Sequence, residues 1–226
     1  MLRILHSSDL HGAYEVLLAH RASFDVWLDT GDFFPNCGRV QATGHRIDPE
    51  TERRYQLCWL EDTNLLARLS EWLAGRPALS VSGNHDFVSM AALLREAGAD
   101  AHEITTEGIR VSGYTWAGFR EVPWMGGEWE GEVENFTALV DAAFSADPDI
   151  LATHAPPTGI LDSPGLFGIP KLKEALTGRA HRIRAHFFGH EHDDGGKWVR
   201  IGRTLCVNSA MSIVIVSLPA PERGGR

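Results

Sequence analysis

The segment FFGHEH, residues 187–192, places two histidines one residue apart, directly after two aromatic residues and a glycine. In a β-strand, residues i and i+2 share a face, so His190 and His192 could both point toward one place. Neutral imidazole nitrogens are common ligands of transition metals. The pair therefore indicates a metal site, provided that other parts of the chain supply further ligands.

Four more polar clusters each follow an apolar stretch, in the order SSDLH, DTGDFF, SGNHD and ATHAPP. Across the five clusters, the candidate metal ligands are oxygen or imidazole donors without sulfur: Asp9, His11, Asp32, Asn84, His154, His190 and His192. Such donors suit manganese, iron, zinc, cobalt or nickel. Seven donors are too many for one ion and about right for two. Asp32, on a tight turn at Gly31, is the natural carboxylate to bridge them.

Two divalent ions roughly 3.5–4 Å apart form a clamp for in-line displacement at phosphorus. Their charge, offset by Asp9, Asp32 and a hydroxide, leaves a single positive charge, which matches the charge of a phosphodiester. The expected reaction is attack of the metal-bridging hydroxide on phosphorus. His85, beside Asn84, is expected to protonate or stabilise the leaving oxygen, and Asp86 is expected to hold the His85 ring.

Strand and helix patterns alternate along the chain, which indicates an α/β fold. The strands that end in the five clusters are expected within residues 2–8, 24–32, 77–86, 148–157 and 184–192. One long helix is expected over 51–75, two strands joined at TEG over 100–118, and two closing strands over 197–210 and 212–219. Ligands bind beyond the carboxyl ends of the strands in open α/β sheets, so the clusters are expected to converge.

The bulk composition bounds the class of protein. The chain has 226 residues and 43% apolar residues, which fits one domain over residues 1–218 with a disordered tail at 219–226. Its net charge of −9 favours a small phosphate-ester substrate over nucleic acid, which stays possible. The three cysteines form no metal-binding spacing. Neither a signal peptide nor a membrane span is expected, so the expected location is cytoplasmic; the oligomeric state stays open.

The motifs DLH, GD, GNHD, THAPP and GHEH, in this order between residues 9 and 192, resemble those of the calcineurin-like metallophosphoesterase superfamily. Together the five motifs are specific, whereas GD alone would carry no information. The resemblance implies a four-layer αββα fold, in which two mixed β-sheets are flanked by helices. It also implies a dinuclear metal site and the activity of a phosphoric ester hydrolase.

The resemblance further implies how the ligands divide between the two ions. One ion would be held by Asp9, His11, Asp32 and His192. The other would be held by Asp32, Asn84, His154 and His190. His85 would be the catalytic histidine, and manganese is the first expectation for both ions, with iron, zinc, cobalt or nickel as alternatives.

The stretches YQLCWLE, THAPP, HFFGHEH and VNSA are similar to those of the small MPPED-type (239AB-like) branch of the superfamily, whose members are described as phosphodiesterases, some acting on cyclic nucleotides. Both histidines of the final motif are present, so an active enzyme is expected. The arginine that follows GD in protein phosphatases is missing, because the chain reads GDFFPN. The alternatives are a phosphomonoesterase on a small metabolite, a nuclease, a protein phosphatase and a catalytically silent scaffold.

Several other residues carry weaker expectations. Trp116, Trp124 and Trp129 are close in sequence and are expected to form either a core anchor or a wall on which a base stacks. Asn36 and His45 lie in the long irregular segment 33–50, where contact with substrate is possible. Asn208 is expected to fix the backbone near the site.

Overall fold

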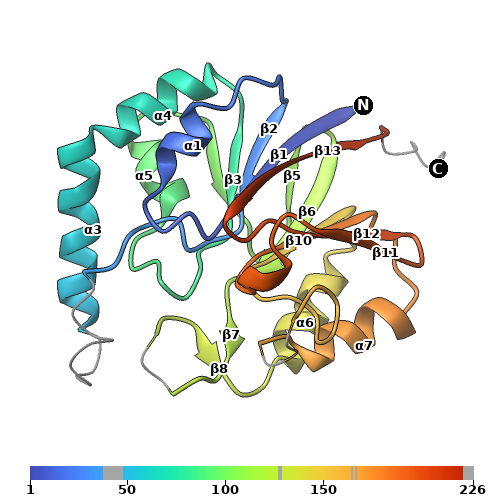
Figure 1. The fold of residues 1–226 in the computed structure, drawn as a ribbon. Coiled ribbons are helices and arrows are strands. Elements are labelled where there is room, and N and C mark those ends of the chain that lie inside the picture. The colour runs from blue at the N-terminus through green and yellow to red at the C-terminus, as the bar shows by residue number, and fades with distance from the viewer. Residues whose placement is uncertain (38–47, 127–128, 164, 166, 221–226) are drawn as a thin grey trace.

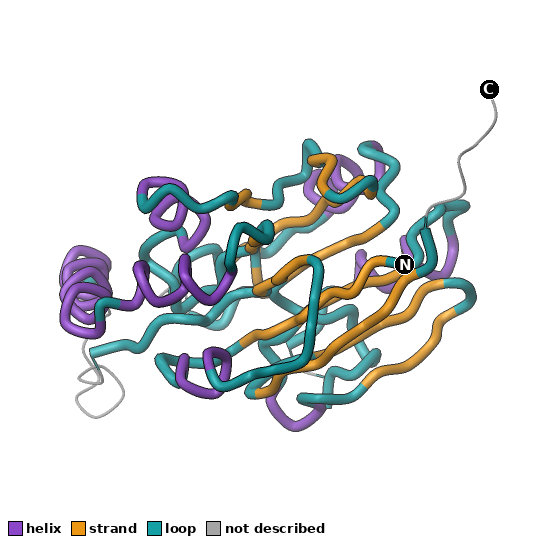
Figure 2. The backbone as a smooth tube through the Cα atoms, turned by 90° about the horizontal axis from the view of Figure 1, so that it is seen from above, coloured by secondary structure: helices purple, strands orange, loops and turns teal. Residues whose placement is uncertain are grey.

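Two β-sheets pack face to face, and helices cover both outer faces (Figures 1 and 2). This computed structural model describes residues 1–37, 48–126, 129–163, 165 and 167–220. The strand order is β13-β1-β2-β3-β4 in the first sheet and β11-β12-β10-β9-β6-β5 in the second. Both sheets contain parallel and antiparallel pairs. The four-layer αββα arrangement is therefore confirmed.

The first sheet carries the first three motifs. Its strands are β1 (Leu2–Ser8), β2 (Val26–Asp29), β3 (Ala78–Ser80), β4 (Ala101–Glu103) and β13 (Ser212–Leu218). Strands β1 to β4 run parallel, and β13 closes the sheet antiparallel to β1. The helices on its outer face are α1 (Tyr14–Leu18), α3 (Pro49–Thr63), α4 (Leu65–Leu73) and α5 (Met90–Glu96).

The second sheet carries the last two motifs. Its strands are β5 (Ile109–Val111), β6 (Tyr114–Phe119), β9 (Ile150–Thr153), β10 (Ala185–Phe188), β11 (Trp198–Ile201) and β12 (Thr204–Asn208). Helices α6 (Thr137–Ser145) and α7 (Pro170–Gly178) pack on its outer face. The remaining elements are short: β7 (Val122–Pro123), β8 (Glu132–Val133) and the 3-10 turn η1 (His192–Asp194).

The apolar runs of the central strands follow from burial on both faces. Ile4 and Leu28 point between the sheets, whereas their neighbours Leu5 and Trp27 point into the layer below the helices. Successive strand residues face opposite sides, so a strand between two layers needs an apolar residue at every position. The strands stop being apolar where they reach the edge shared by both sheets, and the polar clusters begin there.

Three predicted elements are corrected. The helix expected over 51–75 is two helices, because Asn64 has a φ of 50° and turns the chain between α3 and α4. The segment 100–118 holds three strands instead of two: TEG joins β4 in the first sheet to β5 in the second, and β5 then pairs antiparallel with β6. The segment 197–210 holds two strands, β11 and β12, which pair antiparallel.

Some expectations fall where the structure describes little. The predicted tail lies mostly outside the described residues, as does His45 together with most of the segment 33–50. In the described part of the chain, every helix is too short or too polar to cross a bilayer.

Candidate metal centre

The five polar clusters meet where the carboxyl ends of β1, β2, β3, β9 and β10 come together. Main-chain hydrogen bonds join the loops: Asp9 N–H donates to Gly31 O at 2.8 Å, and Gly189 N–H donates to His154 O at 2.9 Å. A third link crosses between the sheets, because the His190 N–H donates to Asp9 Oδ2 at 2.8 Å. The loops therefore form one connected rim.

Three groups of side chains on this rim could each hold a cation, with ligand atoms within 4.8 Å of one another. They are Asp9 with His11 and His192, His11 with Asp32 and His85, and Asp32 with His154 and His190. His11 and Asp32 each belong to two groups, so the groups are contiguous. The structure thus brings six of the seven predicted ligands together, and the seventh, Asn84, contacts His154.

Asp9 is fixed by the protein on one side and open on the other. Its Oδ2 accepts from Ser8 Oγ at 2.6 Å and from the His190 N–H, whereas its Oδ1 faces His192 Nε2 at 3.2 Å. Burial alone would raise the pKa of Asp9, but the His192 hydrogen bond and the charge on His154 outweigh burial and lower it. The carboxylate is therefore held ionised with one oxygen facing the site.

Asp32 likewise has one oxygen bound to the main chain and one oxygen that faces the site. Its Oδ1 accepts from the His85 N–H at 2.8 Å, and its Oδ2 lies 3.3 Å from His154 Nε2 and 4.0 Å from His85 Nε2. Burial opposes the charge, but His154 and His85 lower the pKa of Asp32 well below its ordinary value. An open oxygen between two sets of ligands is the geometry that a bridging carboxylate requires.

His154 is completely buried and held at both nitrogens. Its Nδ1–H donates to Thr30 O at 2.7 Å, and its Nε2 lies 3.1 Å from Asn84 Oδ1. Burial would lower the pKa of His154, but the charge of Asp32 and their hydrogen bond raise it to about 10. Positive charge at Nε2 is thus stabilised by two oxygens, and a metal cation could take the place of that proton.

His190 supplies a direct test of whether this site suits a metal. Its Nε2 is buried and has no hydrogen-bond partner among the described residues, although it belongs to the group with Asp32 and His154. Burial lowers the pKa of His190 to about 4, so the ring is neutral. A buried acceptor without a donor is costly unless something fills the position, and a neutral imidazole nitrogen is a metal ligand. The donor set and this orphaned nitrogen both fit divalent transition metals.

The backbone is forced into unusual conformations at this rim. Asp9, His11, Asp32 and His190 have φ values of 55°, 43°, 55° and 66°. A positive φ destabilises the fold at each of these residues. Such a conformation persists only where the surrounding structure enforces it, as at ligand-binding sites. The expected i, i+2 strand geometry of FFGHEH is therefore wrong. Strand β10 ends at Phe188, and both histidines reach the site from the turn that follows.

The motif glycines are required by close packing of the loops. A Cβ at Gly83 would lie 2.1 Å from Asp32 Oδ1, and one at Gly189 would lie 1.9 Å from Ser8 Oγ and 2.1 Å from Asp9 Oδ2. Any side chain at these positions would displace the two carboxylates. The glycines of GNHD and GHEH thus allow the loops to interlock around the ligands.

His85 lies at the open edge of the site. Its ring is 5.2 Å from the His11 ring, centroid to centroid, and 3.7 Å from the Trp129 ring, which covers one face. Its Nε2 points toward Asp32 Oδ2. This position lets His85 reach a bound substrate, and it also lets the ring join His11 and Asp32 as a ligand. The catalytic role therefore stays a prediction.

The expected contact of Asp86 with the His85 ring is wrong. The Asp86 carboxylate accepts from the main-chain N–H groups of Asp32, Phe34 and Gly83 at 2.8, 3.2 and 2.7 Å. It is buried, and burial together with the charge of Asp32 raises its pKa to about 6. Asp86 thus ties the GD and GNHD turns together.

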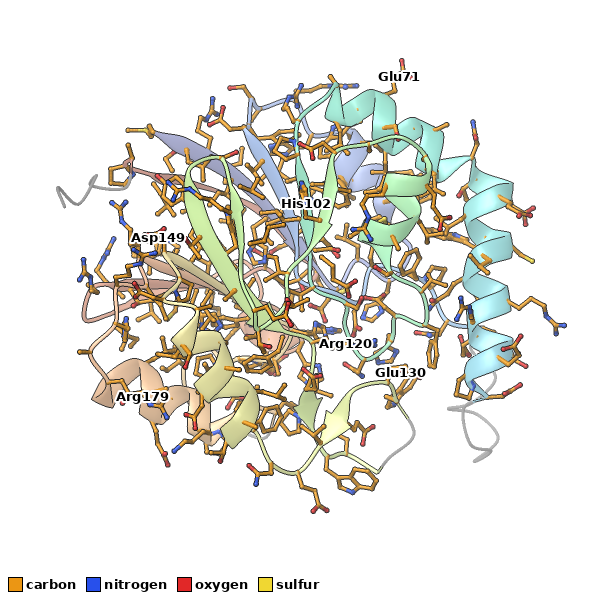
Figure 3. The ribbon with its side chains drawn as sticks, turned by 180° about the vertical axis from the view of Figure 1, so that it is seen from behind. Glu71, His102, Arg120, Glu130, Asp149 and Arg179 are labelled. Carbon is orange, nitrogen blue, oxygen red and sulfur yellow. The ribbon has the colours of Figure 1, made fainter. Side chains whose placement is uncertain are left out.

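Two residues from the second half of the chain, both labelled in Figure 3, donate hydrogen bonds to the GNHD turn. Arg120, just after β6, donates from Nη2 to Gly83 O at 3.0 Å and to Asp86 O at 3.1 Å. Glu130 donates its main-chain N–H to Asn84 O at 3.2 Å. The turn is therefore held by both sheets.

The tryptophans separate in the structure. Trp116 is fully buried between the sheets, Trp124 is 55% exposed, and only Trp129 touches the site. A shared stacking wall is therefore wrong. Asn208 fixes the backbone as expected, because its Nδ2 donates to Glu191 O at 2.8 Å and its Oδ1 accepts from the Ala210 N–H.

Sequence reasoning missed Glu52 and Gln56 on α3. Both are buried, and they contact the loops that carry Asn36 and His85. The available signal was their spacing: Glu52, Gln56 and Leu60 fall on one helix face at i, i+4 and i+8, and Leu60 is in the core. Polar residues on the buried face of an amphipathic helix need buried partners.

The family model described as Calcineurin-like phosphoesterase matches residues 2–194. The chain belongs to this family. Family membership confirms the resemblance seen in the five motifs and implies a hydrolase that cleaves phosphate esters with divalent metal ions. The metal-binding groups described above lie within the matched residues.

Two curated relatives are similar to part of the chain. Metallophosphoesterase domain-containing protein 1 of Homo sapiens is 30% identical in an alignment 139 residues long, and the match covers 53% of this chain and 39% of that protein. The Mus musculus protein of the same name matches with the same values. The chain thus matches about two fifths of the length of these relatives.

Among solved structures, TT1561 of Thermus thermophilus is similar to nearly the whole chain. The TM-score is 0.61 at 15% sequence identity, and the match covers 95% of this chain and 98% of that one. This likeness shows that the four-layer fold is shared.

Proposed function

We propose that this calcineurin-like phosphoesterase uses two divalent metal ions to hydrolyse small phosphodiesters, with cyclic nucleotides among the candidates. One observation carries the proposal: six predicted ligands from four loops fall in contiguous groups linked through His11 and Asp32, and the GNHD loop adds Asn84 beside His154. Ligands shared in this way suit two neighbouring ions better than one.

The ligands divide as follows in this proposal. One ion would be held by Asp9, His11, Asp32 and His192. The other would be held by Asp32, Asn84, His154 and His190. When bound, the two ions would supply an acidified water and Lewis acidity toward the phosphate oxygens. Manganese is the first candidate, because oxygen and imidazole donors suit it, and iron, zinc, cobalt and nickel follow.

The protein's own residues would handle the leaving group. His85 Nε2 points into the site, so the ring can hold a proton there and give it to the leaving oxygen. The Trp129 ring covers one face of His85 and restricts water on that side. Asp86 would contribute by keeping the two turns together.

A diester is favoured over a monoester by the placement of positive charge. Asn36 stands where the GD loop could have carried an arginine, and it is neutral. Arg120, the arginine beside the GNHD turn, is committed to the carbonyls of Gly83 and Asp86. Among the described residues, Arg120 therefore offers no free guanidinium to a second phosphate charge, which favours a monoanionic ester.

The test is a comparison of two chromogenic esters. Protein stripped of metal and reloaded separately with each candidate metal should hydrolyse bis-p-nitrophenyl phosphate faster than p-nitrophenyl phosphate, and the Asp32→Asn variant should hydrolyse neither. The opposite ratio would overturn the diester preference. Lack of hydrolysis of both esters, cyclic nucleotides and short nucleic acids with every metal would overturn the function and favour a silent scaffold.

The proposed partner is a small phosphate ester; nucleic acid is an alternative that is not favoured, and no membrane partner is proposed. The cytoplasmic location and the single-domain boundary at residue 218 stay predictions.

A further inference from the structure

The His85 ring is held on the side that faces away from the ligand groups. Its Nδ1 lies 2.8 Å from Asn36 Oδ1. An amide oxygen can only accept a hydrogen bond, so Nδ1 must carry the proton in this pair. Asn36, for which the sequence suggests contact with substrate, therefore contacts the candidate catalytic ring.

The orientation of the Asn36 amide is set by its other contacts. Its Nδ2 donates to Glu52 Oε2 at 3.1 Å and to the main-chain oxygen of His85 at 3.2 Å. The carboxylate of Glu52 also accepts from the main-chain N–H of Cys37 at 3.1 Å and from its Sγ at 2.8 Å. Both partners of Nδ2 are acceptors, so the amide cannot turn over without placing its oxygen against them.

Helix α3 supplies this arrangement from outside the five motifs. Glu52 and Gln56 are one turn apart and both buried. Gln56 Nε2 donates to His85 O at 2.7 Å, and Gln56 Oε1 accepts from the Phe87 N–H at 2.9 Å. The helix therefore holds the backbone on both sides of Asp86, directly after His85, and contacts the His85 ring through Asn36.

We propose that Glu52 and Asn36 are positioning residues for His85. Glu52 fixes the orientation of the Asn36 amide, and Asn36 fixes the ring proton of His85 on Nδ1, which leaves Nε2 to face the substrate. This inference rests on the proposed function for its catalytic meaning, although the ring orientation can be measured without activity.

The arrangement matches the proton transfer that the reaction requires. When His85 protonates a leaving oxygen, the N–H bond at Nε2 breaks and an O–H bond forms on the leaving group. The ring is then neutral, with its remaining proton on Nδ1 and a lone pair on Nε2. Asn36 Oδ1 stabilises this product form, whereas the other neutral tautomer would place two lone pairs against each other.

The first experiment reads the ring directly. Long-range ¹⁵N–¹H correlation spectra of the metal-free full chain should show the neutral His85 ring protonated at Nδ1. The Asn36→Leu variant should shift the ring proton toward Nε2. The Glu52→Gln variant should give a mixture of both tautomers, because a glutamine amide can donate as well as accept and so permits both orientations of the Asn36 amide. A wild-type ring protonated at Nε2 would overturn the proposal, whether or not the protein hydrolyses any ester.

The second experiment uses two diesters that differ only in the leaving group: the phenyl and p-nitrophenyl esters of thymidine 5′-phosphate. Phenolate is more basic than p-nitrophenolate, so its departure depends more on protonation by a general acid. Asn36→Leu should therefore lower kcat for the phenyl ester about tenfold more than for the p-nitrophenyl ester, with Glu52→Gln intermediate. KM and bound metal should change less than about twofold, since Asn36 touches neither the substrate nor a ligand in this proposal.

The exposed Glu61 on the same helix provides the matched control, and Glu61→Gln should leave both esters unaffected. Equal losses for the two esters, or loss of metal in the Asn36 and Glu52 variants, would mean that these residues only support the fold, and would overturn the positioning role. A wild-type chain inactive on both esters would count against the proposed function, while the spectra would still decide the ring orientation.

Discussion

The two sheets contribute unlike halves to the candidate metal centre. The first sheet supplies both carboxylates, and each has one oxygen occupied by the protein: Asp9 Oδ2 accepts from Ser8 and His190, and Asp32 Oδ1 accepts from His85. The second sheet supplies three imidazoles. Among these, His190 Nε2 has no partner in the described part of the chain, and the His192 side chain is 48% exposed.

The difference indicates which half depends on metal. The carboxylate half is tied by hydrogen bonds that exist without an ion, so its geometry should persist in the metal-free protein. The imidazole half has a buried nitrogen that only a further group can satisfy, and it should become ordered and more stable on metal binding. The following predictions test or refine this contrast.

Loss of the shared carboxylate should have the largest effect. Asp32→Asn removes a charge that faces both ligand groups, so both ions should be lost together and turnover should fall to background. Affinity should drop by more than about 100-fold, beyond the effect of changing an outer contact. Metal analysis after dialysis measures this directly, and a variant that keeps one ion per chain would contradict the bridging role.

Loss of His85 should separate catalysis from metal binding. His85→Ala should keep both ions and lower kcat by about 10²–10⁴-fold, which is the usual contribution of a general acid. Metal content and turnover are measured on the same preparation. If the variant loses metal as readily as it loses activity, His85 belongs with His11 and Asp32 as a ligand instead.

Loss of the exposed imidazole should affect one ion only. His192→Ala should weaken one ion by about 10- to 100-fold and leave the second bound, because His192 contacts Asp9 but not Asp32. Titration of the metal-free protein should then show one tight and one weak step. The partly exposed His102→Ala variant is the control, and two weakened steps would mean that the sites are not divided as proposed.

The smallest effect concerns stability in acid. His186 lies behind the imidazole half, fully buried, and burial lowers its pKa to about 3. In the unfolded chain the His186 ring takes up a proton near pH 6.5, whereas in the folded chain it stays neutral. The contribution of His186 to the free energy of unfolding is therefore fully present above pH 6.5 and declines as the pH falls toward 3. His186→Gln should keep the donor to Thr153 Oγ1 and flatten this decline by up to about 1.4 kcal/mol per pH unit.

Denaturant unfolding of the metal-free protein at several pH values measures that slope. The matched control is His102→Gln, the same substitution at a partly exposed histidine. A His186 variant with the wild-type slope would mean that the buried ring takes up its proton without cost.

The sequence predicted the parts of the site that repeat a simple rule. Asp9, Asp32, Asn84, His154 and His190 each follow an apolar strand, and strand ends in an α/β sheet meet at one edge. The burial pattern of the strands likewise follows from their position between two layers. These features depend on local pattern, which a single chain displays.

The features that sequence did not predict depend on contacts between distant segments. Asp86 binds main-chain groups of the GD loop, and Asn36 takes the contact with His85 that Asp86 was expected to make. Glu52 contacts Asn36, and the two residues are 16 positions apart in the sequence. The break at Asn64 depends on a left-handed residue inside an otherwise continuous helical pattern, which the spacing of apolar residues does not report.

The most direct test of the central claim is anomalous diffraction from crystals grown with Mn²⁺. Two anomalous peaks roughly 3.5–4 Å apart should appear, with Asp32 between them, one beside Asp9 and His192 and the other beside His154 and His190. A single peak, or peaks away from the shared edge of the two sheets, would contradict the dinuclear site on which the proposed reaction depends.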